Sequence, residues 1–112
     1  MDNFSIQSDT SGDVAVVTAA GRFDSETSPS LDAALTNILG TKNKIVLELN
    51  GVEYLSSAGL RAIVKALQAA QATGGGVKLA CAPEPVETIL RTVGMMEMLK
   101  MYPSVNEAIA GF

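Results

Sequence analysis

The sequence predicts an α/β protein whose mixed β-sheet is flanked by about four helices. Strand-like and helix-like segments alternate along the chain, as in parallel strands joined by helical crossovers. Near the N-terminus, Phe4–Asp9 and Val14–Gly21 flank a polar turn and predict a β-hairpin, which adds one antiparallel pair. The 112 residues, of which 47% are hydrophobic and 18% charged, suit one core, so we expect residues 1–112 to form one domain.

A first helix is predicted after the polar loop of Gly21–Ser30. Ser28 resembles an N-cap, and Pro29 would then occupy the first helical position. Gly40 suits a position just past the last turn. The apolar residues between them repeat at helical spacing: Leu31, Ala34, Leu35 and Ile38.

The centre of the chain predicts a buried strand followed by a second helix. Lys44–Asn50 contains a nearly continuous apolar run, which is typical of a strand covered on both faces. Residues 51–57 are predicted to form a loop. The next helix should begin near Ala58 and continue to about Ala72, where the glycine-rich turn Thr73–Gly76 stops it.

The C-terminal part predicts shorter elements. They are a strand at Val77–Ala82, a helix at Pro83–Gly94 and a last helix at Ser104–Ala110. Ser104 and Glu107 have the spacing of a capping box for that last helix. Met95–Tyr102 is ambiguous between an edge strand and irregular chain. Cys81 falls within the predicted strand, and we expect it to be inert core.

Charge and composition restrict the class of partner. The net charge is −4 and the sequence pI is about 4.6, which argues against a nucleic-acid surface and favours a basic partner surface. The N-terminus is acidic and lacks the apolar core of a secretory signal. No apolar run approaches the roughly 20 residues that span a bilayer. We therefore expect a cytoplasmic domain without membrane insertion.

The chain has no histidine and one cysteine. A Ser-His or Cys-His nucleophile pair therefore cannot form, nor can the common His/Cys type of zinc site. A single cysteine also cannot form an internal disulfide, which suits a reducing compartment. We expect neither a cofactor nor a metal, and any enzyme would depend on lysine or carboxylates.

Two adjacent serines, Ser56 and Ser57, precede the second predicted helix. Either one could simply cap that helix, which stabilises a protein by roughly 1 kcal/mol. A serine at a helix N-terminus is also a suitable place for a phosphate, because free N–H groups and the positive end of the helix dipole meet there. Gly59, inside the first turn, weakens the helix by about 1 kcal/mol relative to alanine. Close approach by a partner or ligand would explain that glycine.

Several segments together resemble STAS domains, and among them the free-standing anti-sigma factor antagonists of bacteria. The segments are "GRFDSETSPSLDAAL", "IVLEL", "VEYLSSAGL" and "GGGVKLA", in this order and at family-like spacing. The resemblance extends from about Phe4 to Ala110 and implies the STAS fold. It also implies a non-enzymatic regulator of transcription that acts by partner switching in signal transduction.

The resemblance implies that a partner anti-sigma factor phosphorylates this chain on Ser57. Such a partner is also a serine kinase with a histidine-kinase-type ATP fold. It is bound by the unphosphorylated form and released by the phosphorylated form, and a metal-dependent serine phosphatase resets the cycle. The family's loop aspartate corresponds to Asp24, which could accept a hydrogen bond from Ser57 or merely cap a turn. We expect the chain to be a monomer or a weak dimer.

One departure from the family concerns the residue before the phosphorylated serine. Relatives commonly carry an acidic residue there, whereas this chain has Ser56, which is thus the alternative phosphosite. Arg61 and Lys65, spaced i, i+4, lie on one side of the second helix. Beside Ser57 and Gly59 they form either a partner-binding surface or a solvated face.

Two other functions remain open from the sequence. Free-standing STAS domains also serve as subunits of lipid-transporting ABC complexes and of other signalling assemblies, where binding is constitutive. A more distant alternative is an enzyme in which Ser57 is the nucleophile and Lys65 the base. A serine-reactive phosphonate probe would label that enzyme.

Overall fold

A mixed five-stranded sheet is the centre of the fold in the computed structural model, which describes residues 4–95 and 97–112. The elements follow one another as β1 (Phe4–Ser11), β2 (Val14–Phe23), α1 (Ser28–Leu39), β3 (Lys44–Leu55), α2 (Ser57–Ala72), β4 (Gly76–Ala80), α3 (Glu84–Thr92), β5 (Met101–Tyr102) and α4 (Val105–Ala110). The predicted fold class, a mixed sheet flanked by helices, is confirmed.

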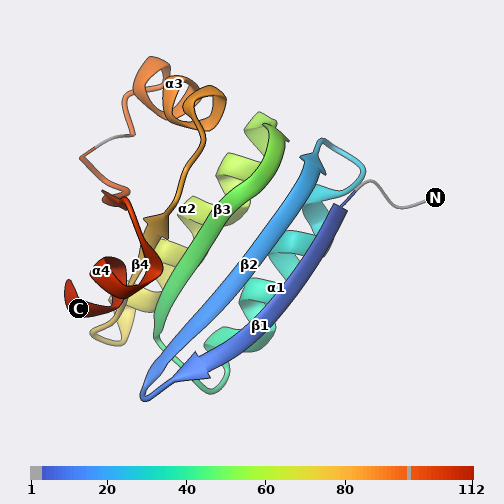
Figure 1. Cartoon of the computed structure of the whole chain (residues 1–112). Helices are drawn as coiled ribbons and strands as arrows, with labels where there is room; N and C mark the ends of the chain where they lie inside the picture. Colours follow the sequence, from blue (N-terminus) through green and yellow to red (C-terminus); the bar gives the residue numbers. More distant parts are fainter. Residues whose placement is uncertain (1–3, 96) are drawn as a thin grey trace.

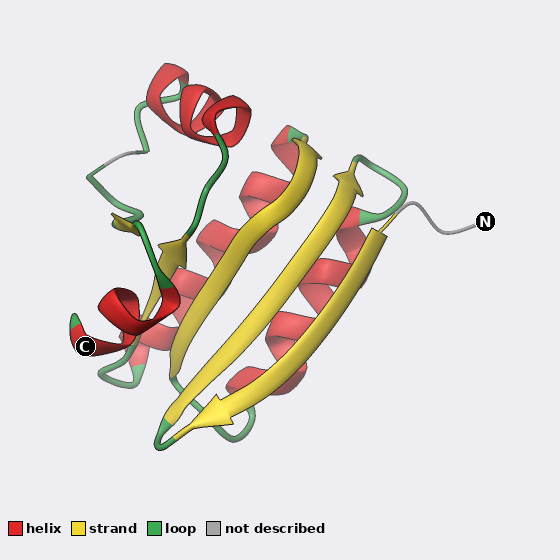
Figure 2. Cartoon of the chain, viewed as in Figure 1, coloured by secondary structure: helices red, strands yellow, loops and turns green. Residues whose placement is uncertain are grey.

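The strands lie in the order β1-β2-β3-β4-β5, so neighbours in the chain are neighbours in the sheet (Figure 1). β1 and β2 are antiparallel, as the predicted hairpin requires, and each remaining pair is parallel. Figure 2 shows α1 and α2 together behind the sheet, covering one face. α4 packs against the other face through β3, β4 and β5.

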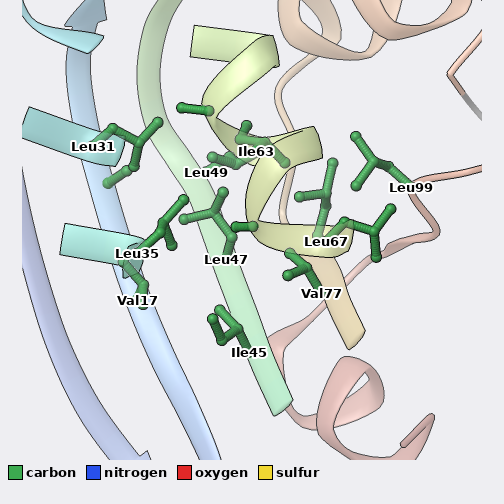
Figure 3. Packing of buried hydrophobic residues seen from close by; sticks show 14 of the residues in the cluster. Val17, Leu31, Leu35, Ile45, Leu47, Leu49, Ile63, Leu67, Val77 and Leu99 are labelled. Carbon is green, nitrogen blue, oxygen red and sulfur yellow. The ribbon is translucent and has the colours of Figure 1, made fainter. Parts of the chain in front are cut away.

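The main core lies between the sheet and the helices α1 and α2 (Figure 3). Val17, Leu47 and Leu79 are register partners across β2, β3 and β4, and each is fully buried. Leucines and an isoleucine from the two helices cover this row: Leu31, Leu35, Ile63 and Leu67. Burying each such side chain contributes roughly 1.5–3 kcal/mol, so this layer fixes both helices on the sheet.

A second, smaller core explains the continuous apolar run in β3. Ile45, Leu47 and Leu49 face α1 and α2, whereas Val46 belongs to a separate cluster with Val14, Ala80 and Ala108. Ala108 belongs to α4, which covers this part of the opposite face. The prediction of a strand buried on both faces is therefore confirmed.

The predicted loop at 51–57 is wrong, because β3 continues to Leu55. The extension pairs with β2 through two register shifts, between Thr18 and Ala20 and between Gly21 and Arg22. Gly51 permits this close pairing, since a β-carbon there would stand 2.8 Å from the β-carbon of Ala20. The shifts break the simple alternation of side chains that sequence patterns rely on.

α1 begins one residue earlier than the sequence predicts. Thr27, not Ser28, occupies the N-cap position, and its side chain makes no capping hydrogen bond. Ser28 is the first helical residue and is 3% exposed, while Pro29 follows at the second position. The polar side chain of Ser28 is therefore inside the protein instead of at a solvated helix end.

The C-terminal elements are shorter than the predicted ones. β4 ends at Ala80, so Cys81 lies beyond the strand, half-buried, with a left-handed φ of 56° and its thiol 3.4 Å from the carbonyl oxygen of Pro103. The expected position within the strand is therefore wrong, and Cys81 packs, partly buried, against the second core cluster. Met101–Tyr102 forms the edge strand β5. The predicted cap of α4 is confirmed, since the Glu107 N–H donates to Ser104 Oγ at 3.1 Å.

Truncation of the core row should cost far more stability than truncation of an exposed apolar residue. We expect Leu47→Ala to lower the free energy of unfolding by about 2–5 kcal/mol, because a buried leucine leaves a cavity when it is shortened. Val93, which is 51% exposed, supplies the control. Val93→Ala should change the value by less than about 0.5 kcal/mol. Urea denaturation measures both, and equal effects would contradict the assigned core.

Candidate functional site

The candidate site lies where β2 and β3 end side by side. Their last residues, Phe23 and Leu55, are register partners, so the following loops leave the same edge of the sheet. The N–H of Ser56 donates to the carbonyl oxygen of Phe23 at 2.8 Å and joins these two connections. The carboxyl ends of parallel strands are the usual position of function in α/β sheets.

Ser56 and Ser57 have different structural positions. Ser56 is the N-cap of α2, half-buried, and its Oγ accepts a hydrogen bond from the Gly59 N–H at 3.3 Å. Ser57 is the first residue of the helix and is exposed. Its hydroxyl forms no hydrogen bond with any residue that the structure describes. The capping role left open between the two serines thus belongs to Ser56, and the Ser57 hydroxyl is accessible.

Gly59 has an internal packing reason. The residue is buried, and a β-carbon there would lie 2.5 Å from Leu55 Cδ1 and 3.3 Å from Ser28 Oγ. Leu55 is itself 2% exposed and has little room to move. Glycine therefore lets the first turn of α2 approach the end of β3 and the start of α1. The chain itself makes the close approach for which the sequence suggested a partner or ligand.

Asp24 organises the loop between β2 and α1. Its Oδ1 accepts hydrogen bonds from the N–H groups of Glu26 at 2.9 Å and Thr27 at 3.0 Å. The hydrogen bond with Thr27, followed by that with Glu26, holds the pKa of Asp24 below its ordinary value. The turn-capping role is the one observed, and no Asp24–Ser57 hydrogen bond occurs among the residues described.

Arg61 and Lys65 are both exposed but differ in their contacts. Lys65 Nζ lies 3.2 Å from both carboxylate oxygens of Asp32, so this ion pair joins α2 to α1. Arg61 forms no ion pair with the residues that the structure covers. Of the two cations, Arg61 is therefore the one available for an external anion.

A groove of about 310 Å³ separates the N-terminal halves of α1 and α2. Its lining comes from the loop before α1 and from both helices: Ser25, Ser28, Pro29, Asp32, Ala58, Arg61, Ala62 and Lys65. Ser28 and Asp32 were not predicted from the sequence as site residues. Their spacing, one helical turn apart at the start of a helix, is too common to single them out, and only the packing of α1 on α2 makes it meaningful.

Among the described residues, no group of three or more histidine, cysteine, aspartate or glutamate side chains has the arrangement of a metal site. None of the helices there combines the length and apolar character needed to cross a membrane.

Comparison with known proteins decides the family. The STAS domain model matches residues 5–108, nearly the whole chain. The chain belongs to the STAS domain family. A relative from Thermotoga neapolitana, which carries the name "putative anti-sigma factor antagonist", is 34% identical over 67 residues. That match covers 60% of this chain and 59% of the relative, so it spans less than two thirds of either protein.

Solved structures agree with the observed fold. A protein of the same description from Thermotoga maritima has 25% identity and a TM-score of 0.88, covering 95% of this STAS chain and 92% of the other. The Bacillus cell fate determinant SpoIIAA in its phosphorylated form has 15% identity and a TM-score of 0.74, covering 95% and 97% of the two chains. At that identity the likeness to SpoIIAA concerns the fold alone.

The two serines should differ in their effect on stability. We expect Ser56→Ala to lower the free energy of unfolding by about 1 kcal/mol, because the N–H of Gly59 loses its capping acceptor. Ser57→Ala should leave the free energy of unfolding nearly unchanged, since the Ser57 hydroxyl forms no hydrogen bond in the described fold. Urea denaturation of both variants and the wild type gives the comparison. A larger loss for Ser57→Ala would reverse the assignment of the cap.

The Asp24 loop should respond to acid. Because its pKa is lowered in the folded protein, the carboxylate contributes stability that is complete above its ordinary pKa. That contribution disappears as the pH falls through the lowered folded value. Asp13, whose pKa is lowered by its hydrogen bond and ion pair with Lys44, behaves likewise and must be separated from Asp24.

Asp24→Asn provides that separation, because it leaves Asp13 unchanged. We expect the wild type to be more stable than Asp24→Asn at neutral pH and the difference to vanish below the folded pKa of Asp24. Unfolding curves at a series of pH values measure this. A difference that stays constant with pH would show that the charge of Asp24 has no role.

Proposed function

We propose that this chain is an anti-sigma factor antagonist whose binding to its partner is controlled by phosphorylation of Ser57. The observation that carries the proposal is the division of roles between adjacent serines. Ser56 caps α2, whereas Ser57 exposes a free hydroxyl at the first position of the same helix. A kinase can reach Ser57 without breaking a hydrogen bond of the described fold.

The physical chemistry of the helix N-terminus favours a phosphate at Ser57. The aligned peptide dipoles of α2 place partial positive charge there, and a phosphate adds about −1.5 to −2 charges. Because Ser57 is exposed, the added group meets solvent instead of the core. Phosphorylation would therefore leave the domain folded and change only the surface that a partner contacts.

The proposed partner is an anti-sigma factor that is also a serine kinase with a histidine-kinase-type ATP fold. The unphosphorylated domain occupies this kinase, and a sigma factor is released. Phosphate on Ser57 then ejects the domain by charge and bulk, and a metal-dependent serine phosphatase restores the binding form. In this scheme the domain is a substrate and a binding module, and all catalysis belongs to its partners.

The named relatives support this function. The Thermotoga proteins carry the name of anti-sigma factor antagonists, although the sequence match spans only part of each. The anti-sigma factor antagonist SpoIIAA, which has the same fold, has been solved in its unphosphorylated and phosphorylated forms. A protein of this fold therefore exists in both states that the proposal requires.

Phosphosite mapping tests the proposal. Mass spectrometry of the protein isolated from its own cells, with and without phosphatase treatment, should find a single phosphate on Ser57. Ser57→Ala should abolish the phosphate, while Ser56→Ala should retain it as long as the domain is folded.

Three results would contradict the proposal. A phosphate on Ser56 would assign the switch to the capping residue, where modification must break the hydrogen bond to Gly59. No phosphate on either serine under any growth condition would argue for constitutive binding, as in a subunit of a transport or signalling complex. A stable stoichiometric complex unaffected by Ser57→Asp would have the same meaning.

A further inference from the structure

Ser28 is a buried polar side chain without a partner. The residue is 3% exposed, and its Oγ has no hydrogen-bond partner within the described structure. That atom faces the first turn of α2, since it lies 3.3 Å from where a β-carbon on Gly59 would stand. Ser28 also lines the groove between α1 and α2. Ser28 therefore lies at the floor of the groove, with its buried hydroxyl between the two helices.

An unsatisfied buried hydroxyl is costly and calls for an explanation. Most buried polar groups are hydrogen-bonded, because desolvation without a partner opposes folding. Alanine at this position would avoid that cost and favour the helix more strongly than serine does. A hydroxyl kept at such a position suits a group that is absent from the isolated chain and enters the groove from outside.

The charges around the groove indicate that the incoming group is an anion. Arg61 lies on the rim without an ion pair in the described structure, while Lys65 and Asp32 neutralise each other. α1 and α2 both begin beside the groove, so the positive ends of two helix dipoles lie at one end of it. A hydroxyl donor, a guanidinium and two helix N-termini together suit a carboxylate.

We propose that this groove receives an acidic side chain, glutamate or aspartate, of the bound protein partner. The Ser28 hydroxyl donates a hydrogen bond to one carboxylate oxygen, and Arg61 pairs with the carboxylate from the rim. The inference rests on the proposed function, since it assigns a contact of the same partner next to Ser57.

This contact explains how phosphate on Ser57 would release the partner. Ser57 and Arg61 are four residues apart on α2, so their side chains are neighbours on the helix surface. A phosphate on Ser57 attracts Arg61 and repels a carboxylate in the adjacent groove. The partner loses its cationic contact and meets a like charge in the same step.

A small probe tests the groove without the partner. The probe is N-acetylglutamate amide, whose only charge is the side-chain carboxylate, and N-acetylglutamine amide is its neutral control. In an NMR titration at constant ionic strength, the glutamate probe should cause saturable shifts of the Ser28, Ala58 and Arg61 amides. Ser28→Ala and Arg61→Gln should each weaken this binding by about tenfold. Ser57→Glu should weaken it as well.

Matched variants separate binding from folding. Ser30→Ala changes an exposed serine of α1 outside the groove and should bind the probe like the wild type. Ser28→Ala should melt at the same temperature as the wild type or higher, because it removes an unsatisfied group. A lower melting temperature would show that the hydroxyl has a structural partner and would overturn the proposal.

Three titration results would also overturn it. They are equal shifts from the glutamate and glutamine probes, unchanged binding by Ser28→Ala, and tighter binding of inorganic phosphate through the same residues. The last would assign the groove to a phosphate instead of a carboxylate. Because the titration needs no phosphorylation, its failure leaves the Ser57 proposal intact. Absence of phosphate on Ser57 in cells would likewise leave the groove result unchanged.

Discussion

The parallel pairing of β2 with β3 is the constraint on which the rest of the structure depends. It places Phe23 and Leu55 beside each other, so the loops before α1 and α2 leave one edge of the sheet. The hydrogen bond from Ser56 to Phe23 then fixes the start of α2 against the end of β2. Without this pairing, neither the exposed position of Ser57 nor the groove between the helices would exist.

Close packing at this edge explains why several site residues have structural roles. Gly59 has no side chain because Leu55 and Ser28 occupy the space a β-carbon would need. The Asp24 carboxylate accepts hydrogen bonds from the N–H groups of its own loop, and these bonds fix the loop from which α1 begins. These residues hold the site in place, while Ser57 and Arg61 remain exposed beside them.

The sequence predicted most of the fold because its signals are local. The strong apolar periodicity of α2 and the hairpin turn required no knowledge of distant contacts. The extension of β3 to Leu55 was missed, since it depends on register shifts against β2 that leave no periodic pattern. The start of α1 was misplaced by one residue, because Ser28 and Thr27 are both ordinary capping residues.

The site was predictable only in part, for the same reason. The positions of Ser56 and Ser57 at a helix start follow from local sequence, and the structure assigns the cap between them. Ser28 gave no signal, because its importance arises from burial beside Gly59, more than 30 positions away in the chain. A residue whose role depends on packing between two helices becomes visible only when the helices are placed.

The net charge of the domain influences a partner at long range, whereas the groups of the groove influence it only on contact. The chain carries −4 overall, so long-range attraction favours a basic partner surface and affects how quickly the two proteins meet. Such forces fall off within about 10 Å at moderate salt, and contact is then decided by local groups. At the proposed contact those groups are Arg61, Ser28 and two helix N-termini, which select an anion. A phosphate on Ser57 would add about −1.5 to −2 charges to the overall charge of −4, and it would place them beside Arg61, where they oppose the entry of a carboxylate. In the proposed scheme, this local repulsion makes a single modification at this position sufficient for a switch.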